Sequence, residues 1–303
     1  MSLTSDNARW VRPFGSADRD GWDVVIDAAV EAWEHTSLYA GRLAEGESRE
    51  VPAGEWEHVV VPLSGSVTVE CEHGKAALAG RPSVFAGPTD VAYVARDTAL
   101  RVTATGGPAR VAVCGAKAAA AHAPAFRHVE AGEVPVELRG AGSASREVRN
   151  FGTPGVLEAD SIIACEVITP AGNWSSYPPH KHDEDRPPEE SALEEIYYFE
   201  TQVEAGAPAP EGADAVGYQR VYGTDDRPID VLAEVRSGDV VLVPHGWHGP
   251  AMAPPGYDLY YLNVMAGPGA ERAWLICDDP AHGWVRQTWT SQDVDPRLPL
   301  GGQ

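Results

Sequence analysis

Two histidines separated by one residue, His180 and His182, are the side chains of this sequence best suited to share a metal ion. Side chains on a β-strand alternate between its faces, so this spacing directs both imidazoles to one side, about 7 Å apart along the strand. Glu195 opens a second strand-like run, and His248 follows in a segment rich in Val, Gly and Pro. Two histidines alone could equally be ordinary core or surface residues, but the added carboxylate and third imidazole favour a metal site.

The donor atoms of these four residues limit which ion they suit. Three imidazoles and a carboxylate suit Zn, Fe, Mn, Ni or Cu and disfavour Mg and Ca, which prefer all-oxygen sites. We therefore predict one divalent ion per chain, with Zn, Mn, Fe and Ni all compatible. Four protein ligands would leave two positions open on a six-coordinate ion, as a bidentate substrate requires.

Length and composition restrict the class of protein. The 303 residues are 43% hydrophobic and suffice for two domains of about 150 residues or one large all-β unit. No apolar run approaches the roughly 20 residues of a membrane span. The first residues resemble no secretory signal, so we expect a cytoplasmic protein. Four scattered cysteines without a C-x-x-C spacing indicate neither a disulfide framework nor a thiolate zinc site.

The formal net charge of −22 argues against nucleic acid and anionic membranes as partners, because both require a basic surface. It leaves a small anionic substrate open. Charges are screened over about 8 Å at physiological ionic strength, so a few arginines in a cleft can dominate locally. Composition leaves a homo-oligomer open as well.

Short β-like segments divided by Gly and Pro follow one another at intervals of about ten residues, a pattern typical of a sandwich or barrel. Residues 22–33 are the exception, because their apolar spacing predicts an amphipathic helix. Residues 56–63 and 65–71 look like two strands around a turn at Ser64-Gly65. After an alanine-rich bridge at 117–125, a second set of strands repeats the layout.

This repetition indicates an internal duplication, with an N-terminal domain at 1–128 and a C-terminal domain at 129–303. The N-terminal domain has no His-x-His pair, and its His58 and His73 are isolated. We expect the metal in the C-terminal domain alone.

The pattern His180-x-His182…Glu195, followed by Gly238-x5-Pro244-x-Gly246-x-His248, resembles the two short motifs of the cupin superfamily. The resemblance implies an all-β fold of two double-stranded β-helix (jelly-roll) barrels, a bicupin, whose N-terminal barrel is degenerate. Two departures from the general motif are a longer interval between His182 and Glu195 and a shorter one before His248.

Those departures, together with the surrounding segments, resemble the 5-deoxy-glucuronate isomerase family of bacterial myo-inositol catabolism. The supporting segments include Tyr177-Pro178-Pro179-His180, Gln219-Arg220-Val221-Tyr222 and Asp279-Pro280-Ala281-His282. The likeness covers residues 146–285, whereas the first half is assigned by length and pattern. It implies conversion of 5-deoxy-D-glucuronate to 5-dehydro-2-deoxy-D-gluconate, an aldose-to-ketose isomerisation. The alternatives are an isomerase of another uronate, of the 4-deoxy-5-hexosulose-uronate type, a cupin Fe(II) dioxygenase, and a non-catalytic sugar-binding or storage bicupin.

Such an isomerisation moves a proton from C2 to C1 through an enediolate, which a divalent metal stabilises as a Lewis acid. Tyr197 shares strand parity with Glu195 and is expected to point inward, whereas Glu194 is expected to face away. The run Asp258, Tyr260 and Tyr261 offers a carboxylate and two phenols as further catalytic candidates. Each of these aromatic residues could equally belong to the core.

The substrate carboxylate calls for a cation, and bidentate geometry favours arginine. Arg220, flanked by two tyrosines in a strand, is the first candidate, with Arg149 and Arg272 after it; an outward-facing strand arginine is the alternative for Arg220. Lys181 has the opposite parity to the two histidines and is expected to face solvent. The acidic interval 183–194, with its Pro187-Pro188 pair, predicts a solvated loop at the barrel mouth. This loop is either a rim that closes over substrate or an inert insertion.

Overall fold

The computed structural model describes residues 5–120 and 124–301, which form an almost entirely β-stranded protein. Within these residues the α-helical segment is α1 (Asn7–Trp10), and the other helical segments are of the 3-10 type. No helix in the described ranges is long and apolar enough to cross a membrane. The 3-10 segments are η1 (Val84–Ala86), η2 (Ala131–Glu133), η3 (Gly142–Ala144) and η4 (Gly283–Ser291).

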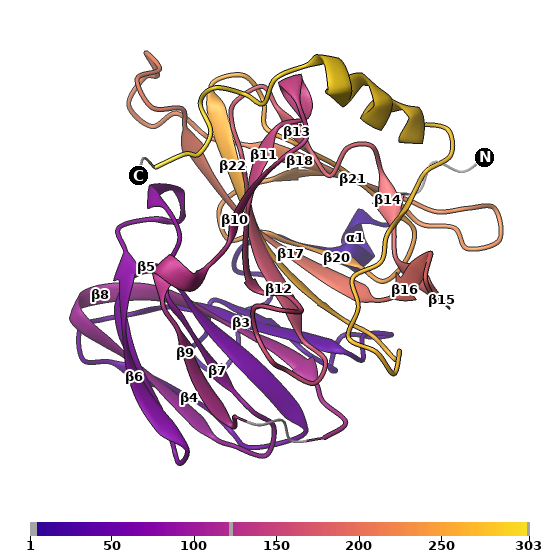
Figure 1. The fold of residues 1–303 in the computed structure, drawn as a ribbon. Coiled ribbons are helices and arrows are strands. Elements are labelled where there is room, and N and C mark those ends of the chain that lie inside the picture. Colours follow the sequence, from indigo (N-terminus) through magenta and orange to yellow (C-terminus); the bar gives the residue numbers. More distant parts are fainter. Residues whose placement is uncertain (1–4, 121–123, 302–303) are drawn as a thin grey trace.

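One eight-stranded sheet forms the N-terminal half, drawn in indigo to magenta in Figure 1. Its strands are β2 (Val24–Ile26), β3 (Thr36–Leu43), β4 (Ser48–Val51), β5 (Trp56–Cys71), β6 (Gly74–Arg81), β7 (Val91–Val94), β8 (Leu100–Lys117) and β9 (Phe126–Val129). They are ordered β2-β3-β8-β5-β7-β9, with β4 paired to β8 and β6 to β5. An apolar cluster that includes Val60, Val67 and Leu78 fills the interior of this half.

Two facing sheets form the C-terminal half. The seven-stranded sheet has the order β1 (Val11–Arg12), β20 (Val240–Val243), β17 (Glu194–Val203), β22 (Tyr257–Ala266), β12 (Ile163–Thr169), β11 (Arg146–Gly152) and β10 (Val136–Arg139). The six-stranded sheet has the order β19 (Asp230–Val235), β18 (Gly217–Tyr222), β21 (Trp247–Met252), β14 (His180–Lys181) and β23 (Cys277–Asp278), with β13 (Trp174–Ser175) paired to β21. A separate hairpin joins β15 (Asp183–Arg186) to β16 (Glu190–Ala192).

The change from one half to the other falls near the expected boundary of 128/129. The N-terminal sheet ends with β9, and β10 already belongs to the seven-stranded sheet. The first strand, β1, crosses this division because it pairs with β20 of the C-terminal half. The alanine-rich bridge at 117–125 lies partly outside the described residues.

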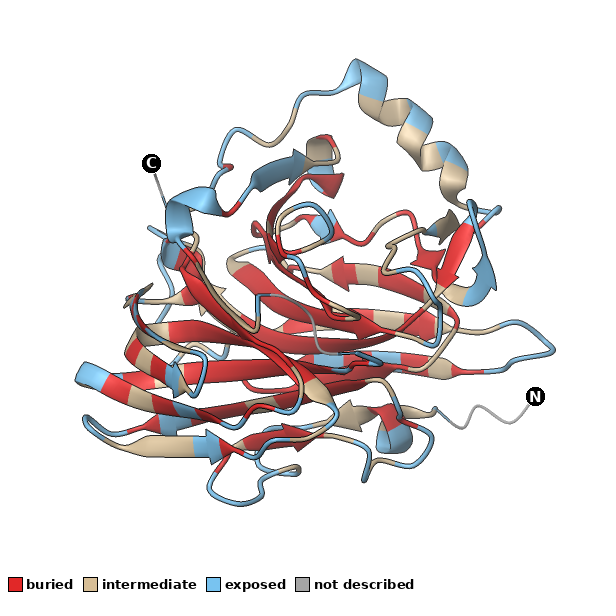
Figure 2. Ribbon diagram, turned by 60° about the horizontal axis from the view of Figure 1, so that its bottom comes forward, coloured by how far each residue is buried: buried red, intermediate tan, exposed pale blue. Residues whose placement is uncertain are grey.

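The seven-stranded sheet is the central layer of the molecule. Tyr198 and Glu200 of β17 contact Arg110 of the N-terminal half, whereas Glu195, of opposite parity, faces His182 in the other direction. With both faces covered, all residues of β12 are buried, as expected for strands packed between two layers. Figure 2 shows this as a band of buried strands through the middle of the protein, with η4, which has no buried residue, outside it.

The helix expected over residues 22–33 is absent, and that prediction is wrong. Val24, Val25 and Ile26 instead form β2, which pairs with β3. All three side chains are buried, and a run of β-branched residues favours a strand covered on both faces. The apolar residues that together suggested one helix belong to two separate features, this strand and the turn that follows it.

The turn expected at Ser64-Gly65 is also wrong, because β5 continues through it as one strand. Its pairing with β8 shifts register between Pro62 and Ser64 and again between Ser64 and Ser66, which marks a β-bulge. Gly65 has φ +75°, and a Cβ there would lie 2.6 Å from the carbonyl oxygen of Pro108. The glycine therefore permits a bulge within the strand.

Candidate metal centre

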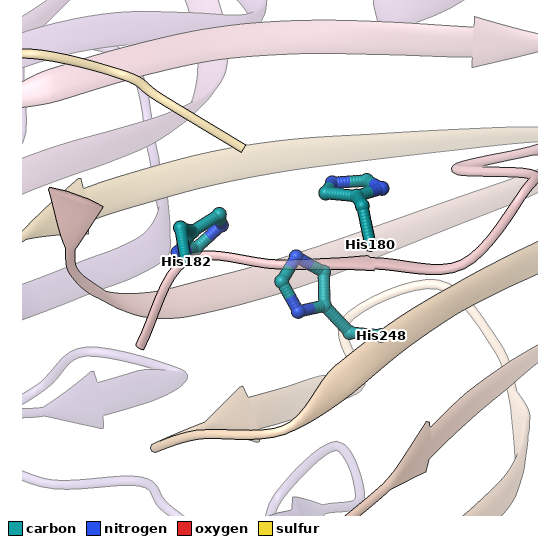
Figure 3. A group of neighbouring side chains, drawn as sticks. All are labelled: His180, His182 and His248. Atoms are coloured by element: carbon teal, nitrogen blue, oxygen red, sulfur yellow. The ribbon is translucent and has the colours of Figure 1, made fainter. Parts of the chain in front are cut away.

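Three buried imidazoles meet on the inner face of the six-stranded sheet. His180 lies on β14, directly opposite His248 of β21 in the strand register, and His182 follows β14. Their exposed fractions are 8%, 1% and 2% for His180, His248 and His182. One nitrogen from each ring lies within 4.8 Å of the other two. Figure 3 shows the three rings grouped together, two from one segment and one from the neighbouring strand.

Glu195 reaches the same point from the opposing sheet. Its Oε2 lies 3.2 Å from His182 Nε2 and 3.1 Å from His248 Nε2. Burial alone would raise the pKa of Glu195, but its contacts with these two histidines outweigh burial and lower the pKa to about 2. The carboxylate is therefore ionised, and the two sheets together supply three imidazoles and one negative charge.

The hydrogen bonds behind the rings fix which nitrogens face Glu195. His182 Nδ1 lies 3.2 Å from the carbonyl oxygen of Leu193, and His248 Nδ1 lies 3.1 Å from that of Gly246. A carbonyl oxygen only accepts, so each Nδ1 carries the hydrogen and donates it. The Nε2 lone pairs then point toward the carboxylate, which is the orientation that second partners impose on metal-binding histidines.

A cation fits between these groups. An unprotonated Nε2 and a carboxylate oxygen are both acceptors, so their close approach is favourable only with a proton or metal ion between them. His248 Nε2 is buried and has no hydrogen-bond partner among the described residues. Separations of 3.1 and 3.2 Å are close to those of neighbouring ligand atoms around an ion with bonds of about 2.0–2.2 Å.

Burial and the nearby imidazoles hold His180 in its neutral, ligating form. Burial is the largest cause that lowers its pKa well below the usual value, followed by the charges of His248 and His182. The pKa of His182 is raised instead, because its contacts with Glu195 outweigh burial. A bound metal ion would take the place of that proton.

A cavity of about 360 Å³ opens beside the imidazoles, between the two sheets of the C-terminal half. Tyr197 and Tyr261 line it, as two of the four residues suggested for catalysis. Tyr261 Oη lies 3.1 Å from Ser176 Oγ, and the two tyrosine rings are 5.0 Å apart. Burial is the main cause that raises the pKa of both phenols. Both are therefore protonated donors at neutral pH.

Asp258 and Tyr260 are not brought to this cavity. The carboxylate of Asp258 accepts hydrogen bonds from the Ala171 amide and the Gln202 side chain at the far end of β22. Tyr260 projects from the other face of β22 and donates to Glu166, 2.7 Å away, toward the N-terminal half. Alternation along the strand separates Tyr260 from its neighbour Tyr261.

The three arginines proposed from the sequence for substrate binding also lie outside the cavity lining. Arg220 pairs with Asp230 at 2.5 Å on the outer side of β18. Arg149 is fully buried between the halves. It donates hydrogen bonds to the Glu147 carboxylate and to the backbone carbonyls of Val84 and Gly87. Arg272 donates to three backbone carbonyls. All three thus have their partners within the protein, away from the cavity.

Glu194 faces away from the three histidines, as its parity predicts, and accepts hydrogen bonds from the backbone of residues 34–36 in the N-terminal half. Lys181 also points away from the histidines, but the expectation that it faces solvent is wrong. Its side chain is 9% exposed, and its Nζ bonds Asp183 at 2.6 Å and Glu190 at 2.7 Å.

The interval 183–194 therefore contains a hairpin, β15 and β16, so the expectation that it lacks regular strands is wrong, whereas residues 184–189 are exposed to solvent as expected. The salt bridge between Lys181 and the fully buried Glu190 anchors this hairpin. None of its residues lines the cavity beside the histidines. The segment around Trp274, Ile276 and Asp278 borders that cavity instead, together with Arg286 of η4.

Four charged residues of the cavity were missed from the sequence: Arg139, Arg146, Asp278 and Arg286. Asp278 of β23 lies opposite His180 in the strand register and receives two hydrogen bonds from Arg286, at 2.5 and 2.7 Å. The sequence could have indicated two of them. Arg139 and Arg146 flank a Gly-rich segment, and a hairpin there would place them side by side.

The fold defines a bicupin, and its C-terminal half carries a candidate metal site. Oxalate decarboxylase from Lactobacillus farciminis, a bicupin, superposes with a TM-score of 0.61 over 89% of this chain and 88% of its own, at 11% identity. At that identity the likeness shows the fold alone. An IolB-like protein from Salmonella typhimurium LT2 superposes with a TM-score of 0.80 at 33% identity, over 91% of this chain and 98% of its own.

The chain belongs to the KduI/IolB family, whose pattern matches residues 10–285. It is 40% identical over 283 residues to the 5-deoxy-glucuronate isomerase of Geobacillus kaustophilus, covering 93% of this chain and 96% of that one. It is 42% identical over 250 residues to the enzyme of the same name from Bacillus subtilis strain 168, covering 80% and 84%. The family resemblance of residues 146–285 thus extends through the N-terminal half.

Proposed function

We propose that this protein is a 5-deoxy-glucuronate isomerase, which converts 5-deoxy-D-glucuronate to 5-dehydro-2-deoxy-D-gluconate. The observation that carries the proposal is 40% identity, over nearly the whole chain, to a relative of that name. The site supports it, because a cavity of about 360 Å³ beside the histidines suits one small sugar acid.

The ligands in this proposal are His180, His182, Glu195 and His248. A divalent ion held there would supply Lewis acidity toward two adjacent substrate oxygens. Glu195 and His248 are buried to 2% and 1% exposure, so their ligand atoms are themselves withdrawn from bulk water. The orienting bonds of His182 and His248 keep Nε2 free in both rings.

The other polar groups of the cavity supply hydrogen bonds to the substrate and transfer the proton. Tyr197 and Tyr261, with raised pKa values, donate hydrogen bonds to substrate oxygens as negative charge develops. Asp278 is the carboxylate on the cavity wall that remains once Glu195 is a ligand. Because it lies opposite His180 across β14 and β23, we assign to it the transfer of the proton from C2 to C1.

The test uses purified protein stripped with chelator and reloaded separately with Mn, Zn, Fe(II) or Ni. The proposal predicts that at least one ion supports conversion of 5-deoxy-D-glucuronate to the ketose, with solvent deuterium appearing at C1 and no oxygen uptake. No turnover with any ion would overturn it. Oxygen consumption would indicate the dioxygenase, and turnover of 4-deoxy-5-hexosulose-uronate alone would indicate the other uronate.

The role of Asp278 has its own test. Asp278→Asn is expected to lower kcat by roughly 10²- to 10⁴-fold, the usual contribution of a positioned acid or base, with metal content unchanged. Asp230→Asn, which alters a carboxylate paired to Arg220 outside the cavity, is the matched control. Wild-type exchange of the C2 proton in Asp278→Asn would assign the transfer to another group.

A further inference from the structure

Two arginines lie directly opposite each other on the cavity wall. Arg139 ends β10 and Arg146 begins β11, and the two are partners in the antiparallel register. Both side chains line the cavity that contains His180 and Glu195. Like charges directly opposite each other across a strand pair are destabilising. An arrangement that carries this cost needs an explanation.

The three arginines of the cavity carry more positive charge than their carboxylate partners neutralise. Arg139 bonds Glu137 at 2.7 and 2.9 Å, and Arg286 bonds Asp278. Arg146 is 5% exposed, yet its one hydrogen bond within the described residues goes to the Ala144 carbonyl. Three guanidinium groups thus face two carboxylates, and a buried guanidinium without a counter-ion is costly.

Aromatic rings hold these guanidinium groups in place. The Trp289 ring lies 5.7 Å from Arg146 and 5.0 Å from Arg286, and the Trp274 ring lies 5.5 Å from Arg139. These contacts fix the arginines before a ligand arrives, which reduces the ordering cost of binding. The arginines line the same cavity as His180 and Glu195, and the charges of Arg146 and Arg286 act on His180.

We propose that Arg146 and Arg139 bind the carboxylate of the sugar acid, with Arg286 of η4 completing this subsite. The inference rests on the proposed function and deepens it, because it assigns the recognition of the acid and the direction in which the sugar lies. A guanidinium matches a carboxylate with two parallel hydrogen bonds. The carboxylate end of the sugar is held at the arginines, and its carbonyl end lies at His180 and Glu195.

The experiment compares two substrates that differ at this group alone: 5-deoxy-D-glucuronate and 5-deoxy-D-glucose, in which a CH₂OH replaces the carboxylate. Arg146→Gln should lower kcat/KM for the acid by roughly 10²- to 10³-fold and leave that for the neutral sugar within about twofold. Arg139→Gln should have the same effect to a smaller degree. Arg146→Lys should restore part of the selectivity because it restores the charge.

Arg220→Gln is the matched control, since it removes an arginine from the same half outside the cavity. It should leave the preference for the acid at the wild-type value. Metal content and melting temperature of each variant establish that the site is intact. If Arg146→Gln does not fold, Arg146→Lys and Arg139→Gln decide the question. Undiminished preference for the acid in these variants would overturn the subsite.

A binding measurement separates failure of the subsite from failure of the proposed function. Calorimetric titration of the metal-loaded protein with D-glucuronate and with D-glucose requires no turnover. If wild type binds the acid more tightly and Arg146→Gln erases the difference, the subsite stands even for a protein that does not isomerise 5-deoxy-D-glucuronate. Equal affinity of wild type for the two sugars would contradict the subsite, whatever the reaction.

Discussion

The two halves of this bicupin use the interior of a similar β-fold in opposite ways. Val60, Val67 and Leu78 help to fill the N-terminal interior with side chains that are at most 1% exposed. The C-terminal interior instead holds three histidines, Glu195 and a cavity bordered by arginines. Close apolar packing stabilises the first half, whereas the second half keeps polar groups buried at a free-energy cost. The candidate site is thus confined to the C-terminal half, which also has apolar residues such as Ile163, Val231 and Leu262 in the core.

The central sheet links these two roles because each of its faces serves one of them. On β17, Glu194 and Tyr198 contact the N-terminal half, while Glu195 and Tyr197 face the cavity. On β11, Arg149 donates to a carbonyl of the N-terminal half, whereas Arg146 lines the cavity. The packed half therefore provides a fixed platform for the strands that carry the site.

The largest effect is expected from removal of a metal ligand. His248→Ala should lower metal affinity by more than about 100-fold and abolish turnover. Loss of a hydrogen-bond partner of a ligand typically costs about 10- to 100-fold in affinity, and loss of the ligand itself should cost more. Elemental analysis after gel filtration measures this. His58→Gln replaces the buried histidine of the N-terminal half and should retain a full complement of metal. Full occupancy in His248→Ala would remove His248 from the site.

The next effect concerns the buried ion pair between the halves. The Arg81 and Glu166 side chains are 2% and 1% exposed. Arg81→Met leaves the buried Glu166 carboxylate with only the more distant Arg149, 3.7 Å away, as a cation, and should lower the free energy of unfolding by about 3 kcal/mol. Denaturant unfolding at pH 7 measures this loss. A change of less than about 1 kcal/mol would show that the pair contributes little to the contact between the halves.

The same pair predicts how stability depends on pH. Burial opposes ionisation of Glu166, but the charge and hydrogen bond of Arg81 outweigh it and hold the pKa of Glu166 below its ordinary 4.5. A lowered folded-state pKa contributes stability that is present above pH 4.5 and is lost as pH falls through the folded value. The difference in stability between wild type and Arg81→Met should therefore shrink below pH 4.5. A constant difference would contradict this assignment.

A third prediction isolates the packed interior. Leu78→Ala removes a 1% exposed side chain from the apolar cluster and should cost about 2–5 kcal/mol of stability. At a temperature where the variant remains folded, its kcat and metal content should match wild type. A large loss of kcat would mean that the two halves are not divided in function as described.

The smallest effect is expected at Arg220. Its ion pair with Asp230 is partly exposed, with side chains at 31% and 49%, and such pairs contribute about 0–1 kcal/mol. Arg220→Ala should change kcat/KM by less than about twofold. A loss of tenfold or more would return Arg220 to the site as a substrate ligand.

Much of the fold and the core of the candidate site could be predicted because strand parity is a local property. The spacing of His180 and His182, and the relation of Glu195 to Tyr197, determine which side chains share a face before the partner strands are known. The all-β fold follows from the spacing of strands and turns. The place where His248 joins the other two histidines required the family resemblance, since sequence spacing alone does not fix how distant strands pair.

The cavity arginines could not be predicted in the same way, because their position depends on a tertiary pairing. Arg146 and Arg149 are three residues apart, so they face opposite sides of β11, and nothing local indicates which side is the cavity. The hairpin of β15 and β16 was missed for a related reason. Most of its charged residues are solvated, but Glu190 is buried and pairs with Lys181 of β14. This pairing exists only in the folded chain.

The most direct test of the proposed metal site is anomalous diffraction from crystals of the active, metal-loaded protein, recorded at the absorption edge of the bound metal. We expect one peak per chain, located between the Nε2 atoms of His182 and His248 and the carboxylate of Glu195, with His180 within bonding distance. A principal peak in the N-terminal half, or one remote from Glu195, would contradict the proposed site.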